Sequence, residues 1–189
     1  MTTLSSSRNE SSTLIRSETP SLVNEPASGP ARYVDVISAE TQIANLLYRY
    51  AEYMDTGDLD AAASLFQHAR IRVSGTSGGI VDASVMLAFW KAAVVLYPDG
   101  TPRTKHVVTN PIIEVDEGVG TATCRSYYTV LQQTDDFPLQ VIVAGRYHDQ
   151  FQRVDGQWRY CLRDYTLIDL VGDLSHHLSR PITPASGSA

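Results

Sequence analysis

An acidic residue and a histidine, far apart in the chain, are the side chains best suited to acid–base chemistry. Asp55 stands in the stretch YMDTGD, and His106 stands in the stretch TKHVVTN among β-branched residues typical of a buried strand. Burying an imidazole without a hydrogen-bond partner is costly. A carboxylate bonded to one ring nitrogen would fix the tautomer and leave the other nitrogen free as a base. The pair would therefore suit proton abstraction next to a leaving group or a carbonyl.

Asp55 is expected at the C-terminal end of a helix, where the helix dipole disfavours a carboxylate. A nearby partner should compensate, and His106 at the start of a strand can provide one. With no nucleophile beside it, such a pair fits dehydration, dehydrohalogenation, double-bond isomerisation or aldol-type ring closure. The alternative is purely structural: an Asp after a helix is usually a turn former, and a strand histidine is usually a satisfied core residue.

Two tyrosines on the same predicted helix are further candidates. Tyr50 shares the apolar face, so core packing is its default role. Tyr53 is the better candidate to donate its hydroxyl to a substrate oxygen or to polarise a carbonyl. Together with Tyr50, the residues expected to contact a substrate are Phe89, Asn110, Tyr128, Val141, Val143 and Tyr147.

Strand alternation puts Val141, Val143 and Tyr147 on one face, with Gly145 leaving room beside them. If that face is concave, it lines a pocket; if it is convex, it meets the helices or a neighbouring subunit. Alternation alone does not decide between the two. Asn110 is expected either to bond within the strand of His106 or to reach the rim of the pocket.

Helical spacing predicts three helices in the first half of the folded part. Ser38 caps the first, and Gly57 ends it. Asp58 caps a short second helix, and Asp82 caps the third. The predicted buried face of the second contains Leu59, Ala62, Ala63 and Phe66, and that of the third contains Val85, Ala88, Phe89, Ala92 and Leu96.

Later in the chain the apolar period changes to two. After a short strand at about 70–74, long strands are expected at about 104–115, 120–133, 139–153 and 157–170, with a hairpin turn at Asp155-Gly156. Helices first and antiparallel strands later predict an α+β fold with the helices on one face of the sheet. A strongly curved sheet closed by helices would leave a cone-shaped cavity, a natural site for a small molecule. Arg163 and Asp164 are expected in a salt bridge at the sheet edge or a subunit interface.

Composition narrows the class of protein. The chain has 189 residues and a net charge of −6, without a Lys/Arg cluster, which argues against nucleic-acid and membrane-surface partners. No apolar run is long enough for a signal peptide or a membrane span, so a soluble cytoplasmic protein is expected. We predict a leader at 1–32, one domain at 33–178 and a flexible tail at 179–189. His176 and His177 would point apart and lack a third ligand, so no metal site is expected.

Three stretches resemble the SnoaL-like branch of the nuclear transport factor 2-like superfamily. They are YRYAEYMDTGDLDAAASLF, TKHVVTN and GRYHDQFQRVDGQWRY, and the resemblance covers about residues 39–169. The Asp55 and His106 positions resemble the Asp–His pair of lindane dehydrochlorinase, scytalone dehydratase and bile-acid dehydratase-like proteins. The resemblance implies a cone-shaped α+β barrel, no cofactor, and often a homo-oligomer, either trimer or dimer.

The resemblance has one departure. Scytalone dehydratase uses a second histidine on the strand after the first, and residues 120–133 contain none here. Tyr53 or Tyr128 would have to supply the missing donor. The leading hypothesis is a cofactor-independent lyase, isomerase or cyclase that acts on a small apolar oxygenated substrate. The alternatives are a protein that only binds a small hydrophobic ligand, and a structural partner similar to the small subunit of ring-hydroxylating dioxygenases.

Overall fold

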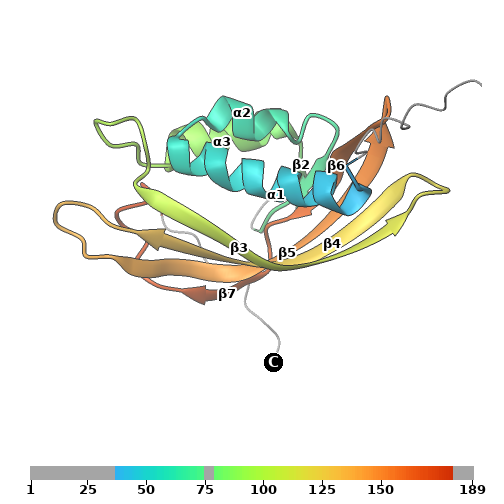
Figure 1. The fold of residues 1–189 in the computed structure, drawn as a ribbon. Helices are drawn as coiled ribbons and strands as arrows, with labels where there is room; N and C mark the ends of the chain where they lie inside the picture. The colour runs from blue at the N-terminus through green and yellow to red at the C-terminus, as the bar shows by residue number, and fades with distance from the viewer. Residues whose placement is uncertain (1–36, 75–78, 181–189) are drawn as a thin grey trace, which may run out of the picture. The chain divides into compact units, whose positions relative to one another are not determined.

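The protein is described by a computed structural model for residues 37–74 and 79–180, so the predicted leader and most of the predicted tail lie outside the described residues. Three helices and seven strands follow one another in these ranges (Figure 1). The helices are α1 (Ala39–Thr56), α2 (Leu59–Ser64) and α3 (Ala83–Ala93). The strands are β1 (Arg70–Arg72), β2 (Ile80–Val81), β3 (Thr104–Asp116), β4 (Thr121–Gln132), β5 (Gln140–Val154), β6 (Gln157–Asp164) and β7 (Ile168–Val171).

The strands form one curved sheet in the order β2-β1-β6-β5-β4-β3, with β7 paired to β5. Within the described strands, β1 and β6 pair in parallel and all other pairs are antiparallel. The helices cover one face of the sheet, as Figure 1 shows. The predicted α+β fold is confirmed, with the sheet curved and left unclosed. In the described part of the chain, each helix is too short or too polar to cross a lipid bilayer.

Helix α1 begins and ends as the sequence predicts, and its end positions Asp55. The Ser38 hydroxyl accepts a hydrogen bond from the Thr41 N–H at 3.2 Å. Gly57 ends the helix in a left-handed conformation with φ of 77°. A Cβ at this glycine would lie 2.1 Å from the carbonyl oxygen of Gly100, so no larger residue fits without a backbone shift. The turn therefore holds the last residues of α1 close to the loop that leads into β3.

Helix α3 buries a different face from the predicted one. Met86, Trp90 and Ala93 are buried, whereas Val85 is 51% exposed and Phe89 is 47% exposed. Helix α3 carries apolar residues around most of its surface. Helical spacing alone therefore allows two different faces of the helix to be the buried one. The larger indole ring is the one that packs inside, against Tyr50 and Phe66. The prediction that Phe89 faces the interior, where it could contact a substrate, is therefore wrong.

Strand β5 departs from simple alternation near its start. Val130 pairs with Val143 but Leu131 pairs with Val141, so one residue of β5 is left without a partner on β4. Such a bulge moves the residues before it to the other face. Val143 and Tyr147 are buried as predicted for a concave face, but Val141 is 47% exposed. The prediction that Val141 shares their face is wrong.

The predicted last strand is two strands. The Asp164 carboxylate accepts hydrogen bonds from the Thr166 N–H at 2.9 Å and the Thr166 hydroxyl at 2.7 Å. This turn ends β6 and allows β7 to pair with β5 along a different stretch. The predicted hairpin before β6 is present, because Asp155 and Gly156 both adopt positive φ.

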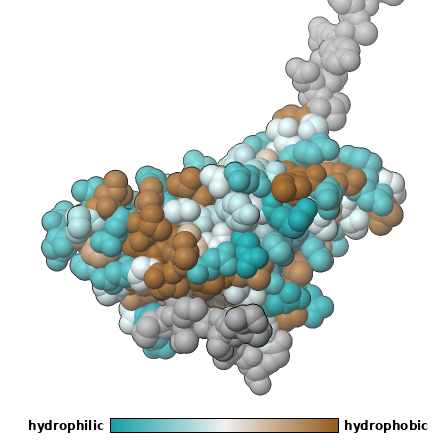
Figure 2. All heavy atoms as spheres, turned by 90° about the horizontal axis from the view of Figure 1, so that it is seen from below, coloured by the Kyte–Doolittle hydropathy of each residue, from teal (hydrophilic) through white to brown (hydrophobic). Residues whose placement is uncertain are grey.

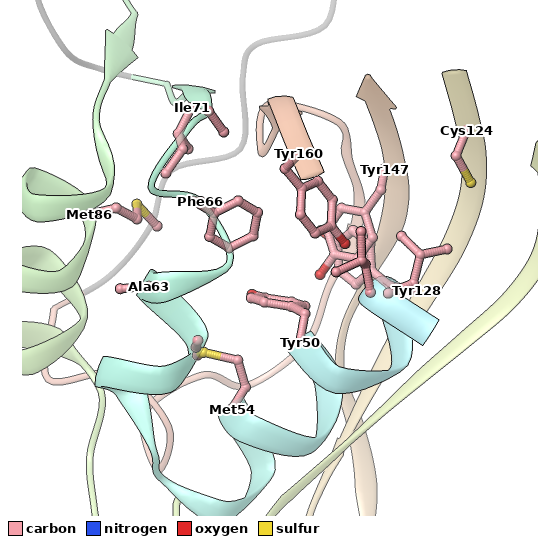
Figure 3. Packing of buried hydrophobic residues seen from close by; sticks show 14 of the residues in the cluster. Tyr50, Met54, Ala63, Phe66, Ile71, Met86, Cys124, Tyr128, Tyr147 and Tyr160 are labelled. Atoms are coloured by element: carbon pink, nitrogen blue, oxygen red, sulfur yellow. The ribbon is translucent and has the colours of Figure 1, made fainter. Parts of the chain in front are cut away.

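The core lies between the helices and the concave face of the sheet and is rich in tyrosine. Figure 3 shows Tyr50 of α1 among Tyr128, Tyr147 and Tyr160 of the sheet, with Phe66 beside it. The face of α2 is buried as predicted. His106 of β3 borders this aromatic interior, because its ring lies beside that of Tyr50.

Candidate functional site

The predicted contact between Asp55 and His106 is present. The Nδ1 of His106 lies 2.6 Å from Oδ1 of Asp55, and the His106 side chain is 7% exposed and the Asp55 side chain 9% exposed. The His106 N–H also donates to Oδ2 at 2.8 Å, and the Thr104 hydroxyl donates to Oδ1 at 2.9 Å. The His106 ring, the His106 N–H and the Thr104 hydroxyl, all at the start of β3, thus fix the orientation of the carboxylate.

These contacts decide the protonation pattern of the pair. Burial raises the pKa of Asp55, but the hydrogen bonds from His106 and Thr104 outweigh it and bring that pKa below its ordinary value of 3.8. A carboxylate only accepts hydrogen bonds, so Nδ1 of His106 carries its proton. Neutral His106 therefore has its lone pair on Nε2. Among the described residues, none hydrogen-bonds to Nε2.

Helix α1 and strand β3 bring the two residues together by simple geometry. Thr104 and His106 are two positions apart and share the inner face of β3, whereas Lys105 points outward and is exposed. Asp55 is the last residue but one of α1, which packs along β3. The carboxylate at the helix end is stabilised by three donors, and this offsets its unfavourable position in the helix dipole.

The ring of Tyr50 lies beside His106, and two further tyrosine rings pack behind it. The ring of Tyr50 lies edge-on to the His106 ring with 6.1 Å between the ring centroids, and Tyr147 lies 6.1 Å from Tyr50. Tyr128 stacks on Tyr147 at 4.3 Å. Burial raises the pKa values of all three hydroxyls, so these phenols are neutral donors at physiological pH. Tyr53 is half-buried and packs against the outside of the core.

A buried ion pair extends this interior. Arg163 is fully buried and donates to the Asp149 carboxylate through Nε at 2.6 Å and Nη2 at 2.9 Å. Its guanidinium carbon lies 3.9 Å from the ring centroid of Tyr147 and 4.7 Å from that of Tyr50. Arg163, which the sequence placed in a salt bridge at a sheet edge or interface, is instead inside the fold. Asp164 forms a separate salt bridge with Arg72 at 2.8 Å.

Sequence reasoning missed the role of Arg163. Two signals were available: its neighbours Tyr160 and Tyr165 are large aromatic residues, and Asp149 stands opposite on the preceding strand of the hairpin. Burial lowers the pKa of Arg163, but the Asp149 carboxylate more than compensates, so the guanidinium stays charged. Its remaining Nη1 group has no hydrogen-bond partner among the described residues and faces aromatic rings.

Asn110 has a backbone role. It is exposed and adopts a positive φ of 53° directly before Pro111, where the pairing of β3 with β4 shifts register. Asparagine tolerates this conformation better than most residues. Asn110 therefore helps to form a bulge in β3, and no described contact directs its side chain to His106.

An open depression of about 560 Å³ lies at the end of the sheet next to the pair. Asp55, Thr104, Gln132 and Leu139 are among its lining residues. Most of its lining residues are polar types, but the surface they present to it is mostly apolar. The depression is open to solvent, so the closed apolar cavity that the sequence predicts stays a prediction. Within residues 37–74 and 79–180, no three His, Cys, Asp or Glu side chains are grouped to hold a metal ion.

Comparison with known proteins gives one family. The sequence profile of the SnoaL-like domain matches residues 35–164. No protein of curated function matches the chain.

Solved structures with the same fold include proteins of several kinds. A Mycobacterium tuberculosis protein of unknown function is 25% identical, with a TM-score of 0.53 over 65% of this chain and 68% of the other. A proposed scytalone dehydratase from Novosphingobium aromaticivorans is 19% identical, with a TM-score of 0.57 over 79% and 95%. The beta subunit of a proposed aromatic-ring-hydroxylating dioxygenase from the same organism is 21% identical, with a TM-score of 0.55 over 71% and 91%. At these identities the last two describe the fold.

Proposed function

The chain belongs to the SnoaL-like domain family, and we propose that it is a cofactor-independent general-base enzyme within it. The reaction is a lyase-type elimination such as dehydration, or an isomerisation or cyclisation, on a small apolar oxygenated metabolite. His106 removes a proton from carbon through Nε2. Asp55 orients the imidazole and stabilises the imidazolium that forms.

The observation that supports this proposal is the 2.6 Å hydrogen bond between His106 and Asp55. It leaves the base nitrogen free, with the tautomer fixed by a carboxylate that is itself held by Thr104. Tyr53 and Tyr128 are the proposed proton donors to a departing hydroxyl. Tyr50, Val143 and Tyr147 would contact the substrate's apolar part.

Two other functions use the same fold. In a protein that only binds a hydrophobic ligand, His106 would accept a hydrogen bond from the ligand and perform no chemistry. A structural subunit would resemble the dioxygenase beta subunit reported above. The buried carboxylate on Nδ1 favours the enzyme, because it would stabilise the imidazolium that forms when His106 takes a proton, and neither alternative forms an imidazolium.

Deuterium exchange tests the proposal without knowledge of the substrate. The probe is 2-tetralone, an apolar bicyclic ketone, incubated in D₂O with the protein and analysed by mass spectrometry. The native protein should accelerate deuterium uptake beside the carbonyl, and the His106→Ala variant should lose that acceleration. His148→Ala, which replaces an exposed histidine on β5, is the matched control. Acceleration that survives His106→Ala would contradict the proposal.

We further propose that the protein forms a homo-oligomer through the outer face of the sheet. Exposed apolar side chains gather there, including Val107, Ile112, Tyr127 and Val141. Figure 2, which looks onto the side of the sheet away from the helices, shows hydrophobic atoms grouped on part of this face. A patch of this kind is typical of a protein interface.

Light scattering on the purified protein measures this assembly. The native chain should have the mass of a dimer or trimer, and Tyr127→Asp should reduce it to the monomer. Phe89→Asp places the same charge on an aromatic residue of α3 that is also about half-exposed, and it should leave the mass unchanged. A monomeric native protein would show the proposed interface to be wrong.

A further inference from the structure

The segment after β7 is fastened to the end of α3 and to the end of β4. The Val95 N–H donates to the His177 carbonyl at 2.9 Å. The His176 carbonyl accepts from the Tyr97 hydroxyl at 2.8 Å and from Nε2 of Gln132 at 2.9 Å. The neighbouring Leu178 forms an isolated bridge with Val94, directly after α3. Several hydrogen bonds thus hold this short segment in one position.

This attachment places His177 at the same end of the sheet as the Asp55–His106 pair. Gln132, which holds the segment, pairs with Thr104 across β3 and β4. The Thr104 hydroxyl donates to Asp55, and His106 is the next inward residue of β3. Burial, and then the nearby His106, lowers the pKa of His177 to about 4, while Asp55 acts in the opposite direction. The His177 side chain is therefore buried at the end of the sheet where Asp55 and His106 meet.

The side chain of His177 is buried but unsatisfied. It is 7% exposed, and no described group lies within hydrogen-bond distance of its Nδ1. Buried polar atoms are nearly always paired, so an unpaired one calls for a ligand or water. Its neighbour His176 is different, because its ring stacks on Phe137 with 4.4 Å between the ring centroids.

From this arrangement we infer that His177 is a substrate-binding residue, whose neutral imidazole hydrogen-bonds an oxygen of the substrate beside the carbon that His106 deprotonates. The inference rests on the proposed function and narrows its substrate class to carbonyl compounds. An imidazole without a carboxylate partner stays neutral at pH 7 and keeps one N–H donor. That donor can stabilise the negative charge that a carbonyl oxygen gains when the neighbouring C–H is broken.

The two histidines thus differ because their partners differ. His106 has a carboxylate on Nδ1, which fixes its tautomer and suits a base. His177 has no carboxylate within hydrogen-bond distance among the described residues and suits a donor. A halide leaving group would gain little from such a donor, so the inference favours enolisation or dehydration over dehydrohalogenation.

Binding of two matched aromatic probes tests this role. The first is 2-naphthol, whose hydroxyl and ring stand in for an enol, and the second is naphthalene, which lacks the oxygen. Both are titrated by fluorescence against the native protein, His177→Phe, His177→Gln and His176→Phe. His177→Phe should weaken 2-naphthol binding about 3- to 10-fold, the usual effect of one lost hydrogen bond. It should leave naphthalene binding unchanged, and His177→Gln, which keeps an N–H donor, should retain most of the affinity for 2-naphthol.

A merely structural role for His177 would weaken both probes equally, and that result would overturn the inference. So would a 2-naphthol affinity that is unchanged in His177→Phe, or a native protein that binds no 2-naphthol. His176→Phe should behave as the native protein does. Titration of 2-naphthol against His106→Ala separates the two proposals. If His106→Ala weakens 2-naphthol binding and the His177 variants do not, the proposed site stands and only the role of His177 fails. If none of the variants changes binding, the proposed site fails as well.

Discussion

Replacing Asp55 by Asn is expected to lower turnover about 10²–10⁴-fold while the protein stays folded. Three donors converge on the Asp55 carboxylate: the His106 ring, the His106 N–H and the Thr104 hydroxyl. An amide has only one acceptor oxygen, and its NH₂ group would face one of these donors. The imidazole would then lose its fixed tautomer, and the imidazolium formed in the reaction would lose its counter-charge.

Two measurements separate this effect from damage to the fold. Turnover of a substrate found by the exchange assay gives the loss, and ¹⁵N chemical shifts of the imidazole report which nitrogen of His106 carries the proton. Asp58→Asn is the matched control, because Asp58 caps α2 through a 2.9 Å bond to the Ala61 N–H and an asparagine caps equally well. An Asp55→Asn variant with native turnover would contradict the role of the pair.

The effect of Asp55→Asn on the free energy of unfolding should depend on pH. The pKa of Asp55 in the folded protein lies below its ordinary value of 3.8. A lowered pKa means that the carboxylate stabilises the fold fully above its unfolded value of about 3.9, and that this stability is lost as the pH falls through the folded value. The contribution of the Asp55 carboxylate to the difference in unfolding free energy between the native protein and Asp55→Asn should therefore be complete above about pH 5 and shrink below it.

The sequence could predict the pair because both positions depend on local signals. Gly57 marks the end of α1, so Asp55 had to lie in its last turn. His106 lies near the start of a strand, and its inward direction follows from alternation with the outward-facing Lys105. Their contact then needs only that α1 packs along the start of β3. The helix end and the strand alternation both depend on residues close together in the sequence, and the packing of α1 on β3 is compatible with both.

The errors arose where two local solutions compete. In α3, both stripes are apolar, and the choice depends on which ring fits against Tyr50; Trp90 fits and Phe89 is left outside. In β5, a bulge shifts Val141 to the outer face, and a bulge has no reliable signal in one strand. Arg163 was misplaced for another reason: the rings and the carboxylate around it come from other parts of the chain, and two adjacent charged residues suggested a sheet edge. His177 was considered only as a metal ligand, because the segments that bury it are distant in sequence.

Replacing Arg163 by Met should destabilise the protein by about 3–5 kcal/mol, because it leaves the Asp149 carboxylate buried without its partner. Burial raises the pKa of Asp149, but the two N–H donors of Arg163 hold it in the ionised form in the native fold. Without them, the carboxyl group must take up a proton or draw in water, and either costs free energy. Urea unfolding followed by tryptophan fluorescence measures the loss of stability. A change below about 1 kcal/mol would contradict the prediction that the buried Asp149 carboxylate needs Arg163 as its partner.

The double variant Asp149→Leu with Arg163→Met tests whether this pair is needed for stability or for the site. Replacing both charges by apolar side chains removes the desolvation cost along with the attraction, so most of the lost stability should return. Activity should not return with it. The guanidinium packs on the rings of Tyr50 and Tyr147, and Tyr50 in turn lies edge-on to His106, so the charged group holds these rings beside the base. A double variant as active as the native protein would mean that the ion pair serves the fold alone; a stable but impaired one would mean that the interior is kept polar to position the rings around His106.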